Sequence, residues 1–475
     1  PHYPPEIQAE TTIINFTVTM SGLEDQLLNL VVEKERPDLA ATSADLISKL
    51  NGFTITMKEL EDSILQKLAS AQGDITEDVE LIEGLEETKR ISNDIEHQSA
   101  LARQTQADIL RTSERYRTVA NRSSLLFFLM NDLSKIHTYY IFSLAAFQQV
   151  FFRAIDLVSG DSNTIGGDDE VEHAQQQEED QQIETRCECL KDSITLTLFN
   201  YIRRGLFESD KLTVLTSLAL KILVNDNKLD PQEARYFVES KTVADAGNMG
   251  PLNEWLPESN WPKIKALEGL DCFASLGDAM QSDSDEWSAW INVEDAENAK
   301  LPGSYDKDLT AFQKLILLRT LRPDRLPTCL RAFIGDTMGK QYVSQESFNM
   351  KATYDETNNK TPIFFVLFAG VDPTPLVENL GRQRGISIDN KRLVNISMGQ
   401  GQEAPAEAIL KKYAKEGGWV MLQNCHLMSS WVPKLERLLE VLSEDAHEDF
   451  RCFLSTEPPP LPSMHNMPES LMQSC

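Results

Sequence analysis

The stretch of sequence with the clearest chemical implication follows a short apolar run at residues 363–368. From there the chain passes through Gly370, Asp372 and Pro373 into a helix-length segment. In a nucleotide-binding sheet this position holds the phosphate loop, which needs glycines, a lysine for the phosphates and a Ser or Thr for magnesium. Residues 369–375 contain one glycine, two prolines without N–H donors, and no lysine, and the Asp372 carboxylate would repel phosphate. The pattern therefore predicts a degenerate phosphate loop that does not hydrolyse ATP.

A second part of the same machinery would stand after the apolar run at residues 419–422. There a Walker-B strand ends in Asp-Glu, which holds magnesium and polarises water. Gln423 and Asn424 occupy those places. Amides cannot act as general bases and bind magnesium weakly, so both halves of the catalytic apparatus are replaced in parallel. We therefore expect no catalytic residue, no bound cofactor and no metal in this chain.

Other candidate sites fail on spacing. The adjacent pair Cys425 and His426 suggests a thiolate nucleophile, but neighbouring side chains diverge and no orienting partner is identifiable. The glycines of residues 399–402 are explained by a strand-to-helix turn. Residues 187–189 (Cys-Glu-Cys) lack a second ligand pair for zinc, and the segment that starts at Asp161 resembles a calcium loop only loosely, without the closing glutamate.

Two arginines flank a Pro-Asp pair at Arg322 and Arg325. Guanidinium groups bind either carboxylate or phosphate in a bidentate manner. The sequence favours ion pairs at a domain junction over phosphate contacts.

The elements that would position the degenerate site are short and regularly spaced. Apolar runs at residues 363–368, 393–396, 419–422 and 450–454 are separated by helix-length polar segments. This alternation predicts parallel strands with helical crossovers. Residues 361–475 are therefore expected to form an α/β domain, which we expect to be incomplete because the chain stops soon after the fourth strand.

A different periodicity governs the first quarter of the chain. Apolar residues recur at intervals of four and three, which is the seam of a helix that meets a partner helix. The positions on this first helix are Leu46, Leu50, Phe53, Met57, Leu60 and Ile64. Residues 73–78 supply turn and N-cap residues, and a second helical run then carries Ile91, Ile95, Ala102, Ile109 and Tyr116 on the same register.

This pattern predicts an antiparallel coiled-coil hairpin over residues 22–118, with a break near Pro37. Two packed helices of a compact bundle would give the same periodicity. A seam that also contains Gln98, Thr105 and Thr112 buries little apolar surface, which favours a projecting arm that braces another part of the molecule.

The remaining segments divide by composition. Residues 1–21 end one α/β domain in a strand at residues 11–19, and residues 119–159 and 185–360 are helical. Residues 160–184 contain glycines, glutamines and acidic side chains with no Lys or Arg, which is typical of a disordered insertion. The fold class is thus α/β plus α.

Charge excludes some classes of partner. The 475 residues contain 45 Lys and Arg against 74 Asp and Glu, a formal net charge of −29. Nucleic acid and anionic membrane are therefore disfavoured, and any polyanion would need a local basic patch. No apolar run approaches the roughly 20 residues that span a bilayer. Seven scattered cysteines indicate reduced thiols, and a start at Pro1 without a signal sequence suggests part of a longer chain.

Several of these segments, taken in order, resemble the motor ring of dynein heavy chains, the AAA+ microtubule motors. Residues 11–28 and 31–39 are similar to the end of the fifth module's α/β domain where it enters its strut. The runs into and through the sixth module are similar at residues 309–325, 362–373, 398–402 and 418–427. Residues 452–462 are most similar to axonemal outer-arm heavy chains of the β type. The acidic insertion and residues 275–305 depart from the pattern.

This resemblance implies degenerate AAA+ modules with a helical lid and a strut, or buttress, formed by the hairpin. The strut would contact the microtubule-binding stalk, and ATP with magnesium would be used in other modules of the whole motor. The implied partners are neighbouring AAA+ modules and the stalk of the same chain, other dynein heavy, intermediate and light chains, and microtubules indirectly. The implied location is the axoneme of cilia or flagella, with the protein in the cytoplasm before assembly.

The resemblance favours a mechanical role for this chain, as a segment that supports minus-end-directed motility. Two other functions are alternatives to this role. One is an autonomous nucleotide hydrolase that uses the sheet after residue 361. The other is an axonemal scaffold that docks basic partners through the acidic residues 160–184.

Overall fold

The computed structural model describes residues 18–70, 79–159, 172–344, 348–368, 370–459 and 466–474. The expected strand at residues 11–19 lies almost wholly outside the described residues, and the expected turn at 73–78 lies outside them entirely. The chain divides into two compact units. Unit 1 comprises residues 1–128 and 148–198, and unit 2 comprises residues 129–147 and 199–475.

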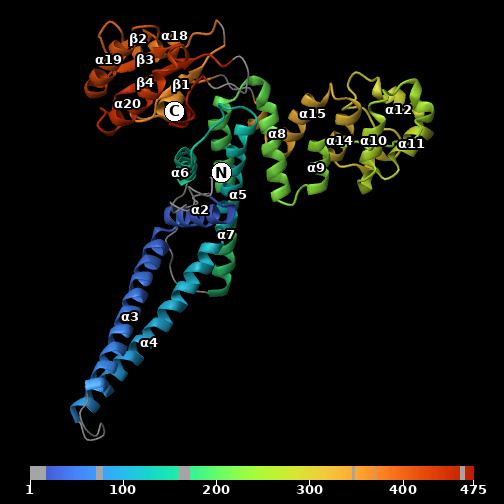
Figure 1. Ribbon diagram of the computed structural model, residues 1–475. Coiled ribbons are helices and arrows are strands. Elements are labelled where there is room, and N and C mark those ends of the chain that lie inside the picture. The colour runs from blue at the N-terminus through green and yellow to red at the C-terminus, as the bar shows by residue number, and fades with distance from the viewer. Residues whose placement is uncertain are drawn as a thin grey trace, which may run out of the picture. The chain divides into compact units, whose positions relative to one another are not determined.

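Unit 1 is helical in its described part (Figure 1). Its helices are α2 (Met20–Glu35), α3 (Pro37–Ser70), α4 (Val79–Glu114) and parts of α5 (Arg117–Asp132), α6 (Leu144–Ser159) and α7 (Glu172–Gly205). Helix α2 begins where the Thr19 side chain accepts a hydrogen bond from the Gly22 N–H (3.1 Å). It ends at Glu35, and Pro37 opens α3, because a missing N–H costs nothing in the first turn of a helix. The predicted break near Pro37 is confirmed.

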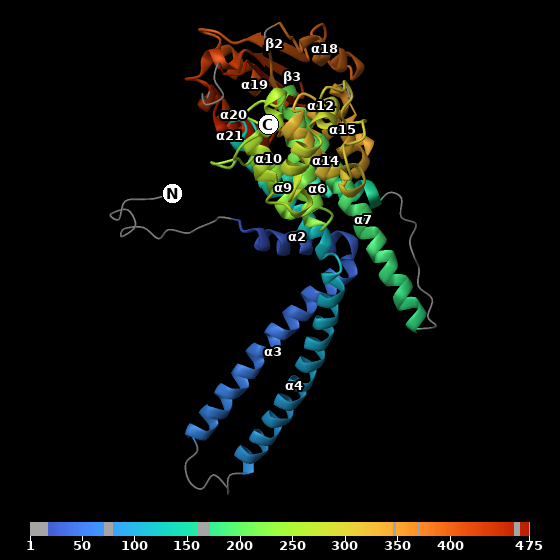
Figure 2. The ribbon, with the colours of Figure 1, turned by 90° about the vertical axis from the view of Figure 1, so that its right-hand side faces the viewer.

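Helices α3 and α4 lie side by side and run in opposite directions (Figure 2). The Ser92 hydroxyl on α4 donates to the Met57 sulfur on α3 (3.5 Å). Half-buried side chains on α3 include Leu46, Leu50, Phe53, Met57 and Leu60. Between them, Ile47 and Ile55 are 46% and 60% exposed, so the apolar contact is confined to one stripe of α3. The side chain of Ile64 lies outside the described part.

The facing stripe of α4 contains Ile91 and Ile95, which are half-buried, and Ala102 and Ile109, which are each only 8% exposed. Tyr116, just after α4, is 4% exposed. These residues recur at intervals of four or seven positions, which keeps them on one side of a 3.6-residue helix.

Of the polar residues expected in this stripe, Thr112 is half-buried, whereas the other two are not. Gln98 and Thr105 are exposed, whereas Ser99 and Gln106 are half-buried. The half-buried polar residues before and after Ala102 therefore lie one position later than predicted. This matters because a step of one residue rotates a side chain by about 100° around a helix. The stripe nevertheless contains short polar side chains, and its apolar burial is modest.

The structure also corrects the expectation of disorder over residues 160–184. Helix α7 begins at Glu172, so residues 172–184 are helical. The segment is rich in Gln and Glu, which have good helix propensity, and this outweighs its polar composition. Residues 160–171 lie outside the described part.

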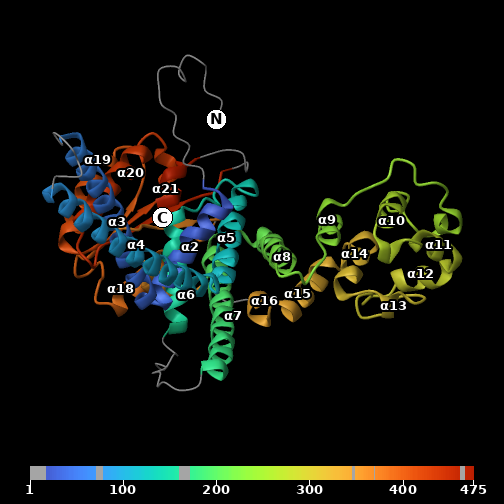
Figure 3. The ribbon, with the colours of Figure 1, turned by 90° about the horizontal axis from the view of Figure 1, so that it is seen from below.

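Unit 2 contains a group of short helices around one apolar core (Figure 3). Large side chains fill this core, among them Trp261, Trp287, Phe273 and Phe312. The helices are α8 (Glu208–Asn225), α9 (Pro231–Glu239), α10 (Trp261–Leu267), α11 (Leu276–Ser282), α12 (Ser284–Ile291), α13 (Tyr305–Asp308), α14 (Ala311–Leu321) and α15 (Leu326–Thr337), with 3₁₀ turns η2 (Gly250–Glu254) and η3 (Asp271–Phe273). The structure thus confirms a helical middle region.

Unit 2 also contains a four-stranded parallel sheet of order β1-β4-β3-β2. The strands are β1 (Ile363–Val366), β2 (Leu393–Ser397), β3 (Trp419–Gln423) and β4 (Arg451–Thr456). All four arise at the predicted apolar runs. Helices α17 (Met350–Asp355) and α18 (Thr374–Gln383) pack on one face, and α19 (Glu403–Glu416), α20 (Val432–Glu444) and α21 (Glu469–Ser474) on the other. The remaining elements are η1 (Leu133–Lys135), α16 (Lys340–Val343) and η4 (Cys425–Met428). This architecture confirms the α/β plus α class and matches an AAA-like α/β module.

The contact between α3 and α4 can be tested with two adjacent residues. Ile109 is 8% exposed and Leu110 is 56% exposed. We expect Ile109→Ala to destabilise α4 by about 2 kcal/mol or more, because it removes a buried side chain. Leu110→Ala should cost about 0.5 kcal/mol or less. Hydrogen exchange of α4 peptides measures both, and equal protection in the two variants would contradict this packing.

Candidate functional site

The loop between β1 and α18 occupies the phosphate-loop position, and its geometry differs from that of a functional loop. Gly370 has a φ of +84°, which favours glycine, and a side chain there would meet open space. Helix α18 starts at Thr374, with Pro373 as its N-cap and Pro375 within its first turn. Two of the residues that would direct N–H groups at a phosphate therefore have no N–H.

Asp372 supplies its own negative charge to the start of α18. One carboxylate oxygen accepts hydrogen bonds from the Thr374 N–H (2.9 Å) and the Thr374 hydroxyl (2.5 Å). A helix N-terminus attracts anions because its first N–H groups are unsatisfied and its dipole is positive there. The Asp372 carboxylate thus takes the place that a phosphate would need.

Gln423, at the end of β3, completes a chain of hydrogen bonds. Its amide nitrogen donates to the Thr374 hydroxyl (2.6 Å), which in turn donates to Asp372. The hydroxyl that a phosphate loop would use for magnesium is therefore engaged on both sides. The structure brings together Gln423 and Asp372, which the sequence had placed in separate motifs, through Thr374, which sequence reasoning missed. The Asp-Pro-Thr-Pro pattern, typical of a helix start, was the signal that could have revealed Thr374.

Asn424 plays a different part. It has a left-handed backbone (φ +58°), and its N–H donates to the hydroxyl of Ser455, which is 1% exposed on β4. Asparagine tolerates this conformation better than most residues. Asn424 thus ends β3 and ties it to β4, and the backbone, not the side chain, makes this contact.

Cys425 and His426 do not form a catalytic pair. Burial raises the pKa of the Cys425 thiol to about 12, and its sulfur lies 3.5 Å from the Leu422 carbonyl. The Nδ1 atom of His426 instead accepts a hydrogen bond from the Glu457 N–H (3.2 Å). The thiol is therefore protonated at neutral pH and has no base beside it.

No metal centre is found within the described ranges, where no group of three or more His, Cys, Asp or Glu side chains is arranged to hold an ion. Cys187 is buried and Cys189 is exposed. Most of the loosely calcium-like segment lies outside these ranges. The described helices also include none that is long and apolar enough to cross a membrane.

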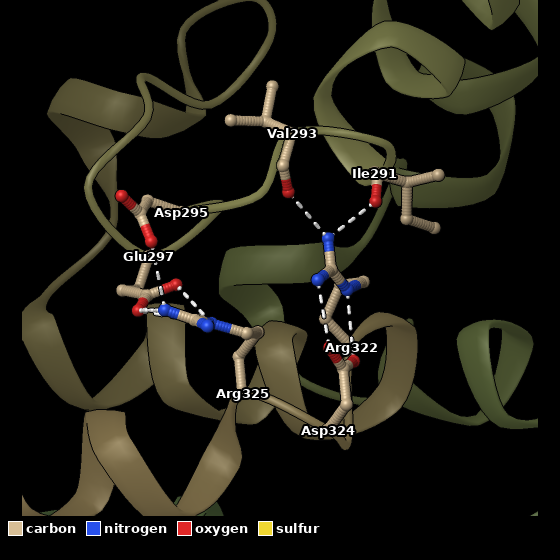
Figure 4. Close-up of polar contacts among 7 residues, drawn as sticks. All are labelled: Ile291, Val293, Asp295, Glu297, Arg322, Asp324 and Arg325. Atoms are coloured by element: carbon tan, nitrogen blue, oxygen red, sulfur yellow. Dashed lines mark hydrogen bonds and ion pairs between the residues drawn. The ribbon is translucent and has the colours of Figure 1, made fainter.

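The two arginines make carboxylate contacts, as the sequence favoured (Figure 4). Arg322 binds Asp324 through two nitrogens (2.9 and 2.8 Å) and donates to the carbonyls of Ile291 and Val293. Arg325 binds Asp295 (3.0 Å) and Glu297. All of these partners belong to the helical group of unit 2, so the contacts lie within that group and fasten the loop after α12 to the junction of α14 and α15.

This fastening predicts a pH dependence. Hydrogen bonding to the Arg325 guanidinium lowers the pKa of Glu297 below its ordinary value of 4.5. A lowered carboxylate pKa stabilises the fold above that ordinary value, and the stabilisation is lost as the pH falls below it. We expect Glu297→Gln to lower the unfolding temperature by roughly 1 to 2 °C at neutral pH, and not at pH about 3.

Glu294→Gln is the matched control, because Glu294 is exposed in the same loop. Thermal unfolding at both pH values measures the effect. An equal loss of stability in the two variants at neutral pH would show that the Arg325 contact contributes nothing specific.

The buried thiol gives a second test. Cys425 should resist alkylation at pH about 8 in the folded chain, because burial excludes the reagent and keeps the thiol protonated. Exposed Cys189 should react readily, and both should react after unfolding. Mass spectrometry of alkylated peptides measures each site, and rapid native labelling of Cys425 would refute the assigned burial.

Comparisons with known proteins agree with this architecture. Residues 358–475 match the family described as "Dynein heavy chain region D6 P-loop domain", and residues 1–95 match "ATP-binding dynein motor region". The chain is 44% identical over 537 aligned positions to the "Dynein alpha chain, flagellar outer arm" of Chlamydomonas reinhardtii. It is 40% identical to "Dynein axonemal heavy chain 9" of Homo sapiens over 474 positions, and 40% identical to the Chlamydomonas "Dynein beta chain, flagellar outer arm" over 477.

Each alignment covers all of this chain, which spans 10% to 12% of the length of these relatives. Because an α chain and a β chain match at 44% and 40%, the identities do not single out the β type. The family matches at both ends of the chain and the identity along its whole length lead to one assignment: this chain belongs to the dynein heavy chain family, within its motor region, with relatives among the axonemal outer-arm heavy chains.

Proposed function

We propose that this chain is a mechanical, non-hydrolysing segment of a dynein motor ring. The observation that carries the proposal is the hydrogen-bond chain from Gln423 through Thr374 to Asp372. It satisfies the start of α18 from within the protein, and the described residues of the β1–α18 loop and the end of β3 supply neither a lysine nor an acidic pair for MgATP. Hydrolysis, with ATP and magnesium, is then the task of other modules of the whole protein.

In this proposal each segment has a structural role. Residues 1–21 end the fifth AAA+ module, and residues 22–118 form its strut. Residues 119–159 and 185–360 are lid and linking regions, separated by the insertion at 160–184, and residues 361–475 begin the sixth module. The strut would couple ring movements to the stalk of the same chain, and so to microtubules, for minus-end-directed motility.

Contacts at the base of the hairpin support a load-bearing role. Arg117, which opens α5, binds Glu24 and Asp25 on α2 (3.0 Å each) and also Glu114 at the end of α4. Asn121 donates a further hydrogen bond to Glu24 (3.1 Å). These contacts join the end of α4 to α2, the helix that precedes α3. A displacement of the hairpin is therefore passed to its base.

A second fastening lies on the other side of the base. Arg186 on α7 binds Glu35, the last residue of α2, through two nitrogens (2.8 and 2.9 Å), and both side chains are largely buried. A bidentate pair fixes orientation as well as distance. Helix α2, which precedes the break at Pro37, is thereby fastened near both of its ends, while the seam of the hairpin itself contains polar residues that limit its own stability.

The names of the relatives suggest where such a motor works. Several matched proteins are described as axonemal, ciliary or flagellar outer-arm chains. We therefore propose assembly in the axoneme, with neighbouring modules and other dynein chains as partners. The relatives do not distinguish α from β type.

The coupling role can be tested in the full-length heavy chain by breaking the hairpin seam. Phe53→Asp with Ile109→Asp places charges in the contact between α3 and α4. We expect microtubule gliding velocity to fall several-fold, because ring movements would no longer reach the stalk through an intact hairpin. The ATPase activity of the ring should be largely retained, because no catalytic residue is altered.

The matched control is Ile55→Asp with Leu110→Asp, which adds the same charges at residues that are 60% and 56% exposed. It should glide at nearly the wild-type velocity. If the seam variant glides as fast as this control, the hairpin does not transmit force and the proposal is wrong.

A further inference from the structure

Positively charged side chains converge on a small recess in the helical group of unit 2. The recess is lined by Tyr236, Ser240, Lys241, Lys263, Arg319 and Thr320, among other residues. They come from the end of α9, the segment that follows it, α10 and α14. The recess has room for about one oxygen-sized atom, close to 10 Å³.

Backbone contacts fix two walls of the recess relative to each other. The Val243 N–H donates to the Pro262 carbonyl (3.2 Å), and the Trp261 indole N–H donates to the Ala246 carbonyl (2.8 Å). The segment after α9 is thereby held against α10. Lys241 and Lys263, which belong to the two segments joined by these contacts, both line the recess.

Arg319 supplies the third wall from α14. Its guanidinium donates to the carbonyl of Val238 (3.1 Å) and lies over the Phe237 ring, 5.2 Å from the centroid. These contacts hold the group at the C-terminal end of α9. Burial lowers the pKa of Arg319, because the charged group has lost hydration without gaining a carboxylate.

The backbone turn at the end of α9 also lines the recess. Glu239 is the last helical residue of α9, and Ser240 is left-handed, with φ 47° and ψ 60°. A right-handed residue followed by a left-handed one turns successive N–H groups toward one concavity, which is a recurrent anion-binding arrangement. Such a conformation is unusual for a residue other than glycine, asparagine or aspartate.

The local charge is opposite to that of the whole chain. Three cations line the recess, and the nearby carboxylate of Glu239 lies 3.6 Å from Lys241. In the described part of the chain, neither Lys263 nor Arg319 forms an ion pair, which contrasts with Arg322 and Arg325 in the same helical group. Arg235 also contacts Glu239 (3.7 Å), so positive charges outnumber this one carboxylate around the recess in a protein whose net charge is −29.

We propose that this recess binds a phosphoryl oxyanion. One oxygen would enter the recess, and the remaining oxygens would contact the lysine ammonium groups and the Ser240 hydroxyl at its rim. A phosphate dianion suits a recess lined by three cations, and Lys, Arg and hydroxyl groups are the usual side-chain ligands of phosphate. The phosphoryl group could come from free phosphate or from a phosphorylated side chain of a partner, and the chemistry is the same.

The test is a titration of the 475-residue chain followed by ³¹P NMR, at constant ionic strength. Inorganic phosphate and O-phosphoserine are the two probes. We expect saturable binding of at least one probe with a stoichiometry of one. Tighter binding of O-phosphoserine would identify a phosphorylated side chain as the source, and tighter binding of inorganic phosphate would identify the free ion.

Lys263→Gln and Lys241→Gln should each weaken this binding by about fivefold or more, as expected for loss of a charge-assisted contact. Lys307→Gln is the matched control, because Lys307 is exposed in the same helical group and its change has the same effect on net charge. It should bind as the wild type does, and unfolding temperatures of all variants should agree. Non-saturable binding, or equal affinity in the Lys263 and Lys307 variants, would overturn the proposal.

Discussion

The carboxylate of Asp372 at the start of α18 is the interaction on which the functional account depends. A parallel sheet places the ends of its strands and the starts of its helices at one edge, and in nucleotide-binding proteins this edge holds phosphate. Here the Thr374 hydroxyl and N–H are both satisfied by Asp372, and Gln423 holds that hydroxyl from the neighbouring strand. The sheet keeps the architecture of a nucleotide-binding domain, while the side chains at the positions that would bind the nucleotide form hydrogen bonds with one another.

Arginine–carboxylate contacts lie where helices and loops of this chain join. Arg117 and Arg186 fasten the two ends of the hairpin base, and Arg325 fastens a loop of the helical group. The hairpin seam, by contrast, combines half-buried apolar residues with serines and a glutamine. The polar contacts thus lie at the junctions of the helices, while the seam of the hairpin buries little apolar surface.

Sequence periodicity was enough to predict most of the helices and strands, but it did not predict the contacts between them. The four strands and the α3 stripe were predictable because apolar spacing reports burial directly. The α4 stripe was predicted one residue early at Gln98, since Ile91 and Ile95 fit two registers equally well. Helix over residues 172–184 was missed because polar composition was weighed above helix propensity. The contact of Thr374 with Gln423 joins residues 49 positions apart and depends on sheet order, which local spacing does not encode.

Whether the start of α18 binds a nucleotide can be measured by titrating the 475-residue chain with MgATP in a calorimeter. A Gly370→Val variant is titrated alongside. Gly370 has positive φ and open space around it, so the variant changes the loop without disturbing a packed core. We expect no micromolar binding of MgATP and no difference between the two proteins. Micromolar, magnesium-dependent binding that is lost in the variant would contradict this expectation.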